Sequence, residues 1–149
     1  MKILVATDGS KFGTAALATA CDVAAQMPDS QIRIITVHEL PGPIAAEPFV
    51  SVPIYTQEIV DNLCTAARSV LANARGMVIS KCPDIPVNTC EARGSATSAI
   101  VDEAQEWGAD LIVVGSHGHG FWGRALLGSV SDAVLHQASC SVLVVRSNE

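Results

Sequence analysis

Apolar residues recur along this chain in two patterns that alternate from one end to the other. Short runs rich in branched side chains predict buried strands over residues 2–6, 32–38, 87–92, 110–114 and 141–146. Between them, apolar positions three and four residues apart predict four helices, the longest over residues 58–78. Strands that alternate with helices favour a parallel sheet covered on both faces. The pattern therefore predicts one three-layer, doubly wound α/β domain over residues 1–149.

One segment, residues 41–56, follows neither pattern. It holds four prolines, at positions 41, 43, 48 and 53, and its apolar residues have no period. Loops of this length are usually functional or disordered. We expect a long surface loop here.

The stretch from Gly115 to Ser129 connects the fourth strand to the last helix and holds five glycines. Glycine is needed where the main chain turns through positive φ, or where another group approaches it closely. Because the first N–H groups of a helix are unpaired and carry partial positive charge, helix N-termini bind anions such as phosphate. Since Gly128 and Ser129 begin a helix, the stretch predicts a phosphate-binding loop. A plain flexible loop is the alternative.

Four familiar motifs are absent from the sequence. The first strand–helix turn, Asp8-Gly9-Ser10, lacks the three glycines of a dinucleotide fingerprint. The segment from Gly123 to Ser129 has the glycine spacing of a P-loop but no lysine. There is neither a G-x-S-x-G nucleophile elbow nor an H-E-x-x-H metal motif. His38 and His136 belong to no motif, and we predict no role for them.

Composition narrows the classes of partner. The formal charge is −6, no cluster of Lys and Arg occurs, and aromatic residues make up 4% of the chain, which argues against nucleic-acid binding. No apolar run approaches the roughly 18 residues of a membrane span, and no leader sequence is evident. We expect a cytoplasmic protein without a membrane partner.

The five cysteines lie far apart, with no C-x-x-C pair and no zinc-ligand spacing. We expect most of them to be buried, inert thiols of a reducing compartment.

Three phrases resemble the nucleotide-binding branch of the universal stress protein family. They are Ile3–Ser10, the run from Asp110 to Gly118, and the segment from Leu127 to Ser131 that leads to Cys140–Val145. The family motif G-2x-G-9x-G-(S/T) is complete at Gly115, Gly118, Gly128 and Ser129. The resemblance covers the whole chain, with its elements in the expected order.

This resemblance implies a Rossmann-like sheet of strand order 3-2-1-4-5 and a site for ATP, or for ADP, AMP or cyclic AMP, with Mg²⁺ possible on the nucleotide. The implied contacts are Asp8 to the ribose or a phosphate-bound metal ion, Val37 and Val114 to the adenine, Gly115 and Gly118 to the ribose and phosphates, and the N–H groups of Gly128, Ser129 and Val130 to the phosphates.

Several of these residues have a simpler alternative. Asp8 could merely cap the turn after the first strand. His117 and His119 could contact phosphate or be only solvated. Arg124 could screen the terminal phosphates or be a surface arginine without a partner.

The function expected from these features is a nucleotide-binding stress-response module in which hydrolysis is slow or absent. One alternative is a weak Mg²⁺-dependent ATPase or nucleotide-dependent transferase that uses Asp8 with His117 or His119. Another is a structural dimer without a ligand. The apolar last strand, Val142–Arg146, is a template for pairing with another chain, and the resemblance implies a homodimer through it.

Overall fold

The computed structural model describes residues 1–39, 57–118 and 127–147. Its centre is a five-stranded parallel sheet of order β3-β2-β1-β4-β5. The strands are β1 (Lys2–Ala6), β2 (Gln31–His38), β3 (Val87–Arg93), β4 (Leu111–Gly115) and β5 (Ser141–Val145). The helices are α1 (Lys11–Ala24), α2 (Gln57–Lys81), α3 (Ala96–Trp107) and α4 (Ser129–Gln137). The predicted fold class and strand order are confirmed.

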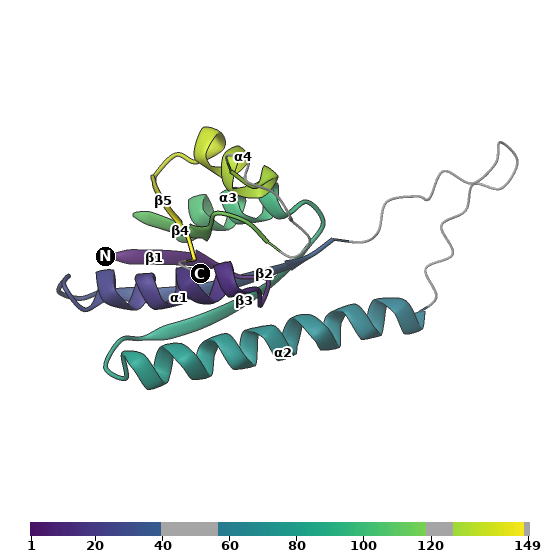
Figure 1. Ribbon diagram of the computed structural model, residues 1–149, viewed down its shortest axis with the longest axis horizontal. Coiled ribbons are helices and arrows are strands. Elements are labelled where there is room, and N and C mark those ends of the chain that lie inside the picture. Colours follow the sequence, from purple (N-terminus) through teal and green to yellow (C-terminus); the bar gives the residue numbers. More distant parts are fainter. Residues whose placement is uncertain (40–56, 119–126, 148–149) are drawn as a thin grey trace, which may run out of the picture.

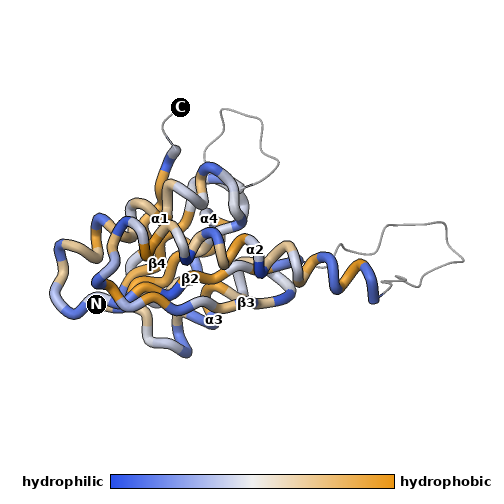
Figure 2. Tube along the Cα trace, turned by 90° about the horizontal axis from the view of Figure 1, so that it is seen from below, coloured by the Kyte–Doolittle hydropathy of each residue, from blue (hydrophilic) through white to orange (hydrophobic). Residues whose placement is uncertain are grey.

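Helices cover both faces of the sheet, with α1 and α2 on one face and α3 and α4 on the other (Figure 1). Each face has its own hydrophobic core, because successive side chains of a strand point to opposite faces. In β1, Ile3 and Val5 pack beneath α1 and α2, whereas Leu4 joins the core beneath α3 and α4. The hydropathy of the chain follows this arrangement, with the most apolar segments inside (Figure 2).

Central and edge strands differ in burial. The middle residues of β1 and nearly all of β4 are buried, while every residue of the edge strands β3 and β5 is at least partly exposed. This difference explains why β1 and β4 are continuous apolar runs, whereas β3 carries Asn88, Thr89 and Glu91 among its apolar residues.

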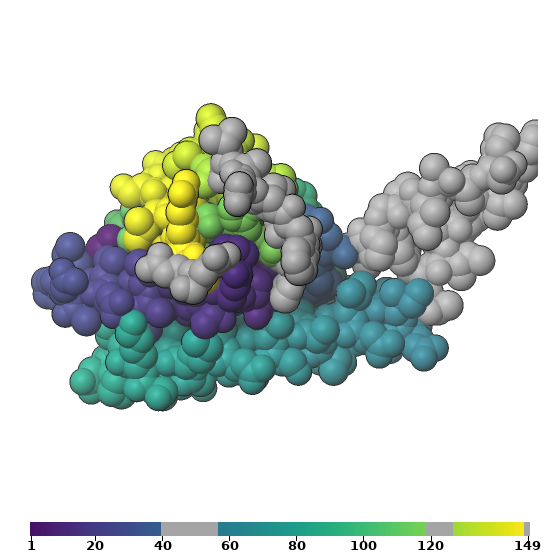
Figure 3. All heavy atoms as spheres, viewed as in Figure 1, coloured from purple at the N-terminus to yellow at the C-terminus, as the bar shows by residue number. Residues whose placement is uncertain are grey.

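The predicted elements differ from the observed ones only at their ends. Helix α2 extends beyond the predicted 58–78 on both sides, to Gln57 and Lys81, and forms the whole lower border of the molecule in Figure 3. Strand β4 lies one residue later than predicted, and β5 ends at Val145 rather than Arg146. The predicted loop at 41–56 falls outside the described residues. None of the helices described here is both long enough and apolar enough to cross a membrane.

The strand order fixes where a ligand would enter. From β1 the sheet grows through β2 to β3, and from β4 it grows in the opposite direction to β5. In doubly wound folds, ligands bind beyond the carboxyl ends of the strands where the order reverses. That point lies between β1 and β4, and the loops after these two strands begin at Thr7 and Ser116.

Candidate functional site

A cavity of about 490 Å³ opens at this edge of the sheet, within the range of small-molecule sites. It is lined by Ala6, Thr7, Asp8, Gly13, Ile35, Val37, Glu39, Ala96, Ile100, Val114, Gly115, His117, Gly118, Gly128, Ser129, Val130 and Ser131. Nine residues proposed from the sequence therefore meet in one place: Asp8, Val37, Val114, Gly115, His117, Gly118, Gly128, Ser129 and Val130. The two others, His119 and Arg124, fall outside the described residues.

Two glycines of the cavity wall allow α1 to approach the sheet closely. A Cβ atom on Gly115 would lie 2.8 Å from the carbonyl carbon and oxygen of Phe12. A Cβ atom on Gly13 would lie 2.5 Å from Thr7 Oγ1. Both distances are shorter than any real Cβ contact, so a side chain at either position would push α1 away from β1 and β4.

Asp8 occupies the turn between β1 and α1. Its Oδ1 accepts a hydrogen bond of 2.9 Å from the Ser10 N–H, so Asp8 does cap this turn. Its Oδ2 lies 2.7 Å from the position that a Cβ atom on Gly118 would take. The carboxylate is thus held between the loops that follow β1 and β4, and its role toward a ligand stays a prediction.

Ser116, which is 1% exposed, connects the loop after β4 to its neighbours through main-chain hydrogen bonds. The Ser116 N–H donates to the Val145 carbonyl at 2.7 Å. The Ser116 carbonyl accepts from the Gly128 N–H at 2.7 Å and from Ser131 Oγ at 3.1 Å. These bonds hold the start of α4 against the end of β4 and fix the direction of its first turn.

The helices α1, α3 and α4, which follow β1, β3 and β4, have different N-termini. At α1, Ser10 Oγ accepts from the Gly13 N–H at 3.2 Å. At α3, Ser95 is the N-cap, and Glu39 Oε1 accepts from the Ala96 N–H at 3.0 Å. At α4 the N-cap is Gly128, and no side chain among the described residues caps the first turn. As far as the described residues show, the first N–H groups of α4 are therefore the ones without a side-chain cap, and such groups can bind an anionic ligand.

The opposite wall of the cavity is apolar. It consists of Ala6, Ile35, Val37, Ile100 and Val114, all members of the core on the α3 and α4 face or packed against it. The titratable side chains among the described lining residues are Asp8, Glu39 and His117. The hydrophobic wall and the start of a helix suit a ligand with an apolar ring and an anionic group, whereas the two carboxylates would repel an anion.

Comparison with known proteins identifies the family of this chain. The model of the Universal stress protein family matches residues 1–146. The chain belongs to the universal stress protein family. Universal stress protein YxiE of Bacillus subtilis is 33% identical over 153 residues, covering 97% of this chain and 98% of YxiE.

Two solved structures extend the comparison. The hypothetical protein MJ0577, solved to assign its biochemical function, aligns with a TM-score of 0.82 and 25% identity over 99% of this chain and 96% of its own. A universal stress protein in complex with cAMP aligns with a TM-score of 0.70 and 23% identity, covering 99% and 98% of the two chains. These structures share the universal stress protein fold.

Some residues of this universal stress protein line the cavity although the sequence did not single them out. Glu39 could have been found by alternation, because it lies two residues after Val37 on the same face of the extended chain. Ser131 lies one turn into the helix that Gly128 begins. Gly13 left no local signal, since its contact with Thr7 arises only when α1 packs against the sheet.

Proposed function

We propose that this universal stress protein binds an adenine nucleotide in the cavity and acts as a stress-response regulatory module. The observation that carries the proposal is the N-terminus of α4, which opens at Gly128 onto a cavity with an apolar wall. Phosphate would be held by the main-chain N–H groups of Gly128, Ser129 and Val130. The adenine ring would pack against Val37 and Val114.

The choice of an adenine nucleotide draws on two further supports. One solved structure of the same fold holds cAMP. The spacing of Gly115, Gly118, Gly128 and Ser129 also follows the family motif. ATP, ADP, AMP and cAMP would share the base and ribose contacts, and they differ in how far the phosphates extend beyond Gly118.

A triphosphate would require a cation in this cavity. Asp8 and Glu39 place two carboxylates in the lining, and their repulsion of a polyphosphate must be offset. Mg²⁺ on the phosphates, which prefers oxygen ligands, would turn Asp8 from a repelling group into a ligand. Arg124 would screen the terminal phosphates, so Arg124→Ala should weaken ATP binding and leave AMP binding unchanged.

We expect slow or absent hydrolysis, because Arg124 would be a single fixed positive charge beside the phosphates. Rapid phosphoryl transfer uses a positioned base together with Lys, Arg and metal ions that neutralise the developing charge. The described lining residues include no Lys or Arg.

The second candidate function, a weak Mg²⁺-dependent ATPase, is favoured by the presence of Asp8 and His117 in one cavity. It would show a turnover that rises with Mg²⁺ and is lost in Asp8→Asn.

The proposal is tested by titrating nucleotide-free protein with ATP and Mg²⁺ in a calorimeter, with GTP as the control ligand. We expect one ATP per chain, weaker GTP binding, and a rise in unfolding temperature at saturating ATP. A protein that gives no heat and no gain in thermal stability with millimolar ATP and Mg²⁺ would instead support the structural dimer without a ligand.

We also propose a homodimer through β5 and a single domain over the whole chain. The edge strand β5 pairs with β4 on one side only, and Val142, Leu143, Val144 and Val145 are all partly exposed. Such an edge is a template for pairing with a second chain. A sedimentation mass of 15.5 kDa at micromolar concentration, equal to one chain, would contradict the dimer.

A further inference from the structure

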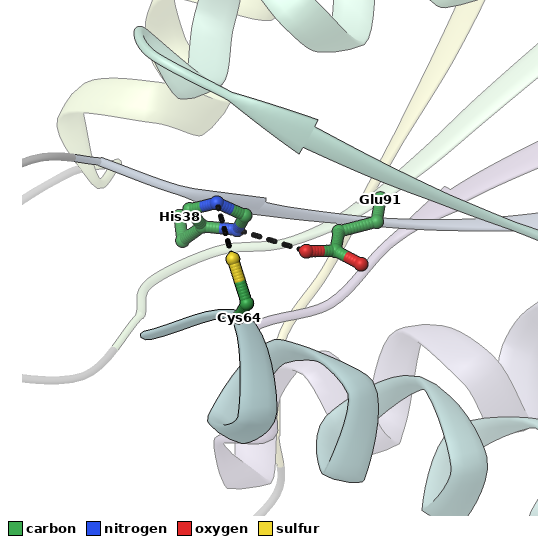
Figure 4. A group of neighbouring side chains, drawn as sticks. All are labelled: His38, Cys64 and Glu91. Atoms are coloured by element: carbon green, nitrogen blue, oxygen red, sulfur yellow. Dashed lines mark hydrogen bonds and ion pairs between the residues drawn. The ribbon is translucent and has the colours of Figure 1, made fainter. Parts of the chain in front are cut away.

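Three side chains meet on the face of the sheet opposite the cavity: His38 at the end of β2, Cys64 on α2 and Glu91 on β3 (Figure 4). His38 Nε2 lies 4.0 Å from Cys64 Sγ, and His38 Nδ1 lies 3.7 Å from Glu91 Oε1. Counting one ligand atom from each residue, the three atoms all lie within 4.8 Å of one another.

The imidazole of His38 is the unusual member of this group. His38 is 8% exposed, and its Nδ1 is buried without a hydrogen-bond partner among the described residues. A buried polar atom that lacks a partner loses its interaction with water without replacement, which destabilises the fold. Such atoms are rare in folded proteins and call for an explanation, of which a missing ion is one.

We propose that His38, Cys64 and Glu91 form a binding site for a thiophilic divalent cation, with Zn²⁺ as the best match. Imidazole nitrogen, thiolate sulfur and carboxylate oxygen are the three donors that zinc uses in proteins. With bonds of 2.0–2.3 Å and tetrahedral angles, neighbouring ligand atoms lie about 3.5 Å apart. One ion binds one nitrogen of His38, whereas Cys64 Sγ lies 4.0 Å from Nε2 and Glu91 Oε1 lies 3.7 Å from Nδ1. The ligand atoms, which lie within 4.8 Å of one another, would therefore have to approach by up to about 1.3 Å as the side chains turn toward the same nitrogen. Water would fill the fourth position.

The register of the sheet explains why the ligands converge. Thr36 pairs with Glu91 and His38 with Arg93, so the side chains of His38, Glu91 and Arg93 emerge on the same face. That face is covered by α2, which presents the buried Cys64 to it. A bound ion would fasten the first turns of α2 to the ends of β2 and β3.

Two arginines contact the sulfur and carboxylate donors. Arg93 Nη2 lies 3.2 Å from Cys64 Sγ, and Arg68 Nε lies 3.5 Å from Glu91 Oε2. Both can withdraw into solvent, since Arg93 is exposed and the Arg68 side chain is 74% exposed. Metal binding would exchange a guanidinium for the cation at the sulfur. Arg93→Gln should therefore tighten metal binding, whereas a structural Arg93–Cys64 contact predicts no such gain.

The test uses the metal-free, reduced protein with Zn²⁺ alone, followed by calorimetry or by competition with a chromophoric chelator. We expect one Zn²⁺ per chain, and a loss of affinity of at least about tenfold in Cys64→Ala, His38→Gln and Glu91→Gln. The matched controls Cys140→Ala and His136→Gln remove the same residue types elsewhere and should bind as the wild type does. Circular dichroism of each variant checks that the fold persists.

Co²⁺ provides a second measurement that is independent of stability. A cobalt–thiolate site absorbs in the near ultraviolet by charge transfer from sulfur, and this band should be absent in Cys64→Ala but present in Cys140→Ala. The proposal is overturned if the wild type binds no Zn²⁺, if Cys64→Ala binds it as tightly, or if Arg93→Gln fails to bind it more tightly.

Discussion

The last residues of β2 separate two regions of different construction. Val37 and Glu39 line the cavity on the α3 face, whereas His38 between them points to Cys64 on the α2 face. The cavity is shaped by main-chain turns, small residues and the start of a helix. The cluster on the α2 face consists of three side chains, His38, Cys64 and Glu91, from three separate elements (Figure 4). A site made of main chain requires glycine at fixed intervals, while a site made of side chains requires only that helix and sheet pack together.

The largest effect is expected where the cavity depends on close packing. Gly115→Ala should destabilise the protein by about 1–3 kcal/mol, because its Cβ would lie 2.8 Å from the Phe12 carbonyl. Gly76→Ala is the matched control, since nothing lies within 4 Å of its Cβ and alanine is the better helix former by about 0.5–1 kcal/mol. Urea unfolding measures both. Equal stability of the two variants would show that the packing at Gly115 has been misjudged.

The cavity, which is built from main chain and glycines, could be predicted from the sequence more fully than the His38–Cys64–Glu91 cluster. The fold and most of the cavity were predictable because parallel strands end at one edge, so Asp8, Val37 and Gly115 had to lie near one another. Gly115, the first glycine of the motif, shows that a motif does not by itself reveal why a residue is needed. The resemblance assigned Gly115 to the nucleotide, whereas the structure shows that Phe12 already requires a glycine there.

His38 shows why the cluster on the α2 face could not be predicted from the sequence. No role was predicted for His38, because Cys64 and Glu91 lie 26 and 53 residues away in the sequence and the three residues match no known metal-ligand spacing. Only the packing of α2 on β2 and β3 brings the three together. The buried cysteines were predicted more successfully, since Cys21, Cys64 and Cys82 are buried while Cys90 and Cys140 are partly so.

A second variant addresses the charge of the cavity. Asp8→Asn keeps an oxygen that can accept from the Ser10 N–H but removes the carboxylate. If Asp8 binds Mg²⁺ on the phosphates, the variant should bind ATP with Mg²⁺ about tenfold more weakly, the equivalent of one charged hydrogen bond. AMP without Mg²⁺ should bind at least as well as in the wild type. Calorimetric titrations with both ligands check this, and an equal loss for both would assign Asp8 to the ribose.

Adjacent substitutions on β2 test whether the two faces are independent. Val37→Thr places a hydroxyl in the apolar wall with little change of shape, so ATP affinity should fall severalfold and Zn²⁺ affinity should not change. His38→Gln should lower the Zn²⁺ affinity and leave the ATP affinity unchanged. The ATP and Zn²⁺ affinities of both variants are measured by calorimetry. If each variant weakens the binding of both ligands, the two faces are not independent and form one site.

The smallest effect concerns thiol reactivity. Burial, with a further contribution from the Cys82 thiol, raises the pKa of Cys21 to about 12, and burial next to Glu103 raises the pKa of Cys90 to about 11. A raised thiol pKa keeps the protonated, unreactive form present until the pH approaches that value. At pH 8, iodoacetamide should therefore modify neither residue in the folded protein, as mass spectrometry would show. Zn²⁺ should lower modification at Cys64 and leave that at Cys140 unchanged.

The most direct test of the phosphate site is a pair of substitutions at Ser129. Proline is favoured at the first position of a helix, and Gly128, at φ −66° and ψ 153°, has the extended conformation that a residue before proline requires. Ser129→Pro therefore removes one main-chain N–H and preserves the helix, whereas Ser129→Ala removes only the hydroxyl.

Both variants are titrated with ATP and Mg²⁺, and their unfolding free energies are compared. We predict a loss of affinity of about tenfold or more in Ser129→Pro, little change in Ser129→Ala, and similar stability in both. If Ser129→Pro is folded and binds ATP as tightly as the wild type, the N-terminus of α4 does not hold the phosphates, and the account of the cavity is wrong.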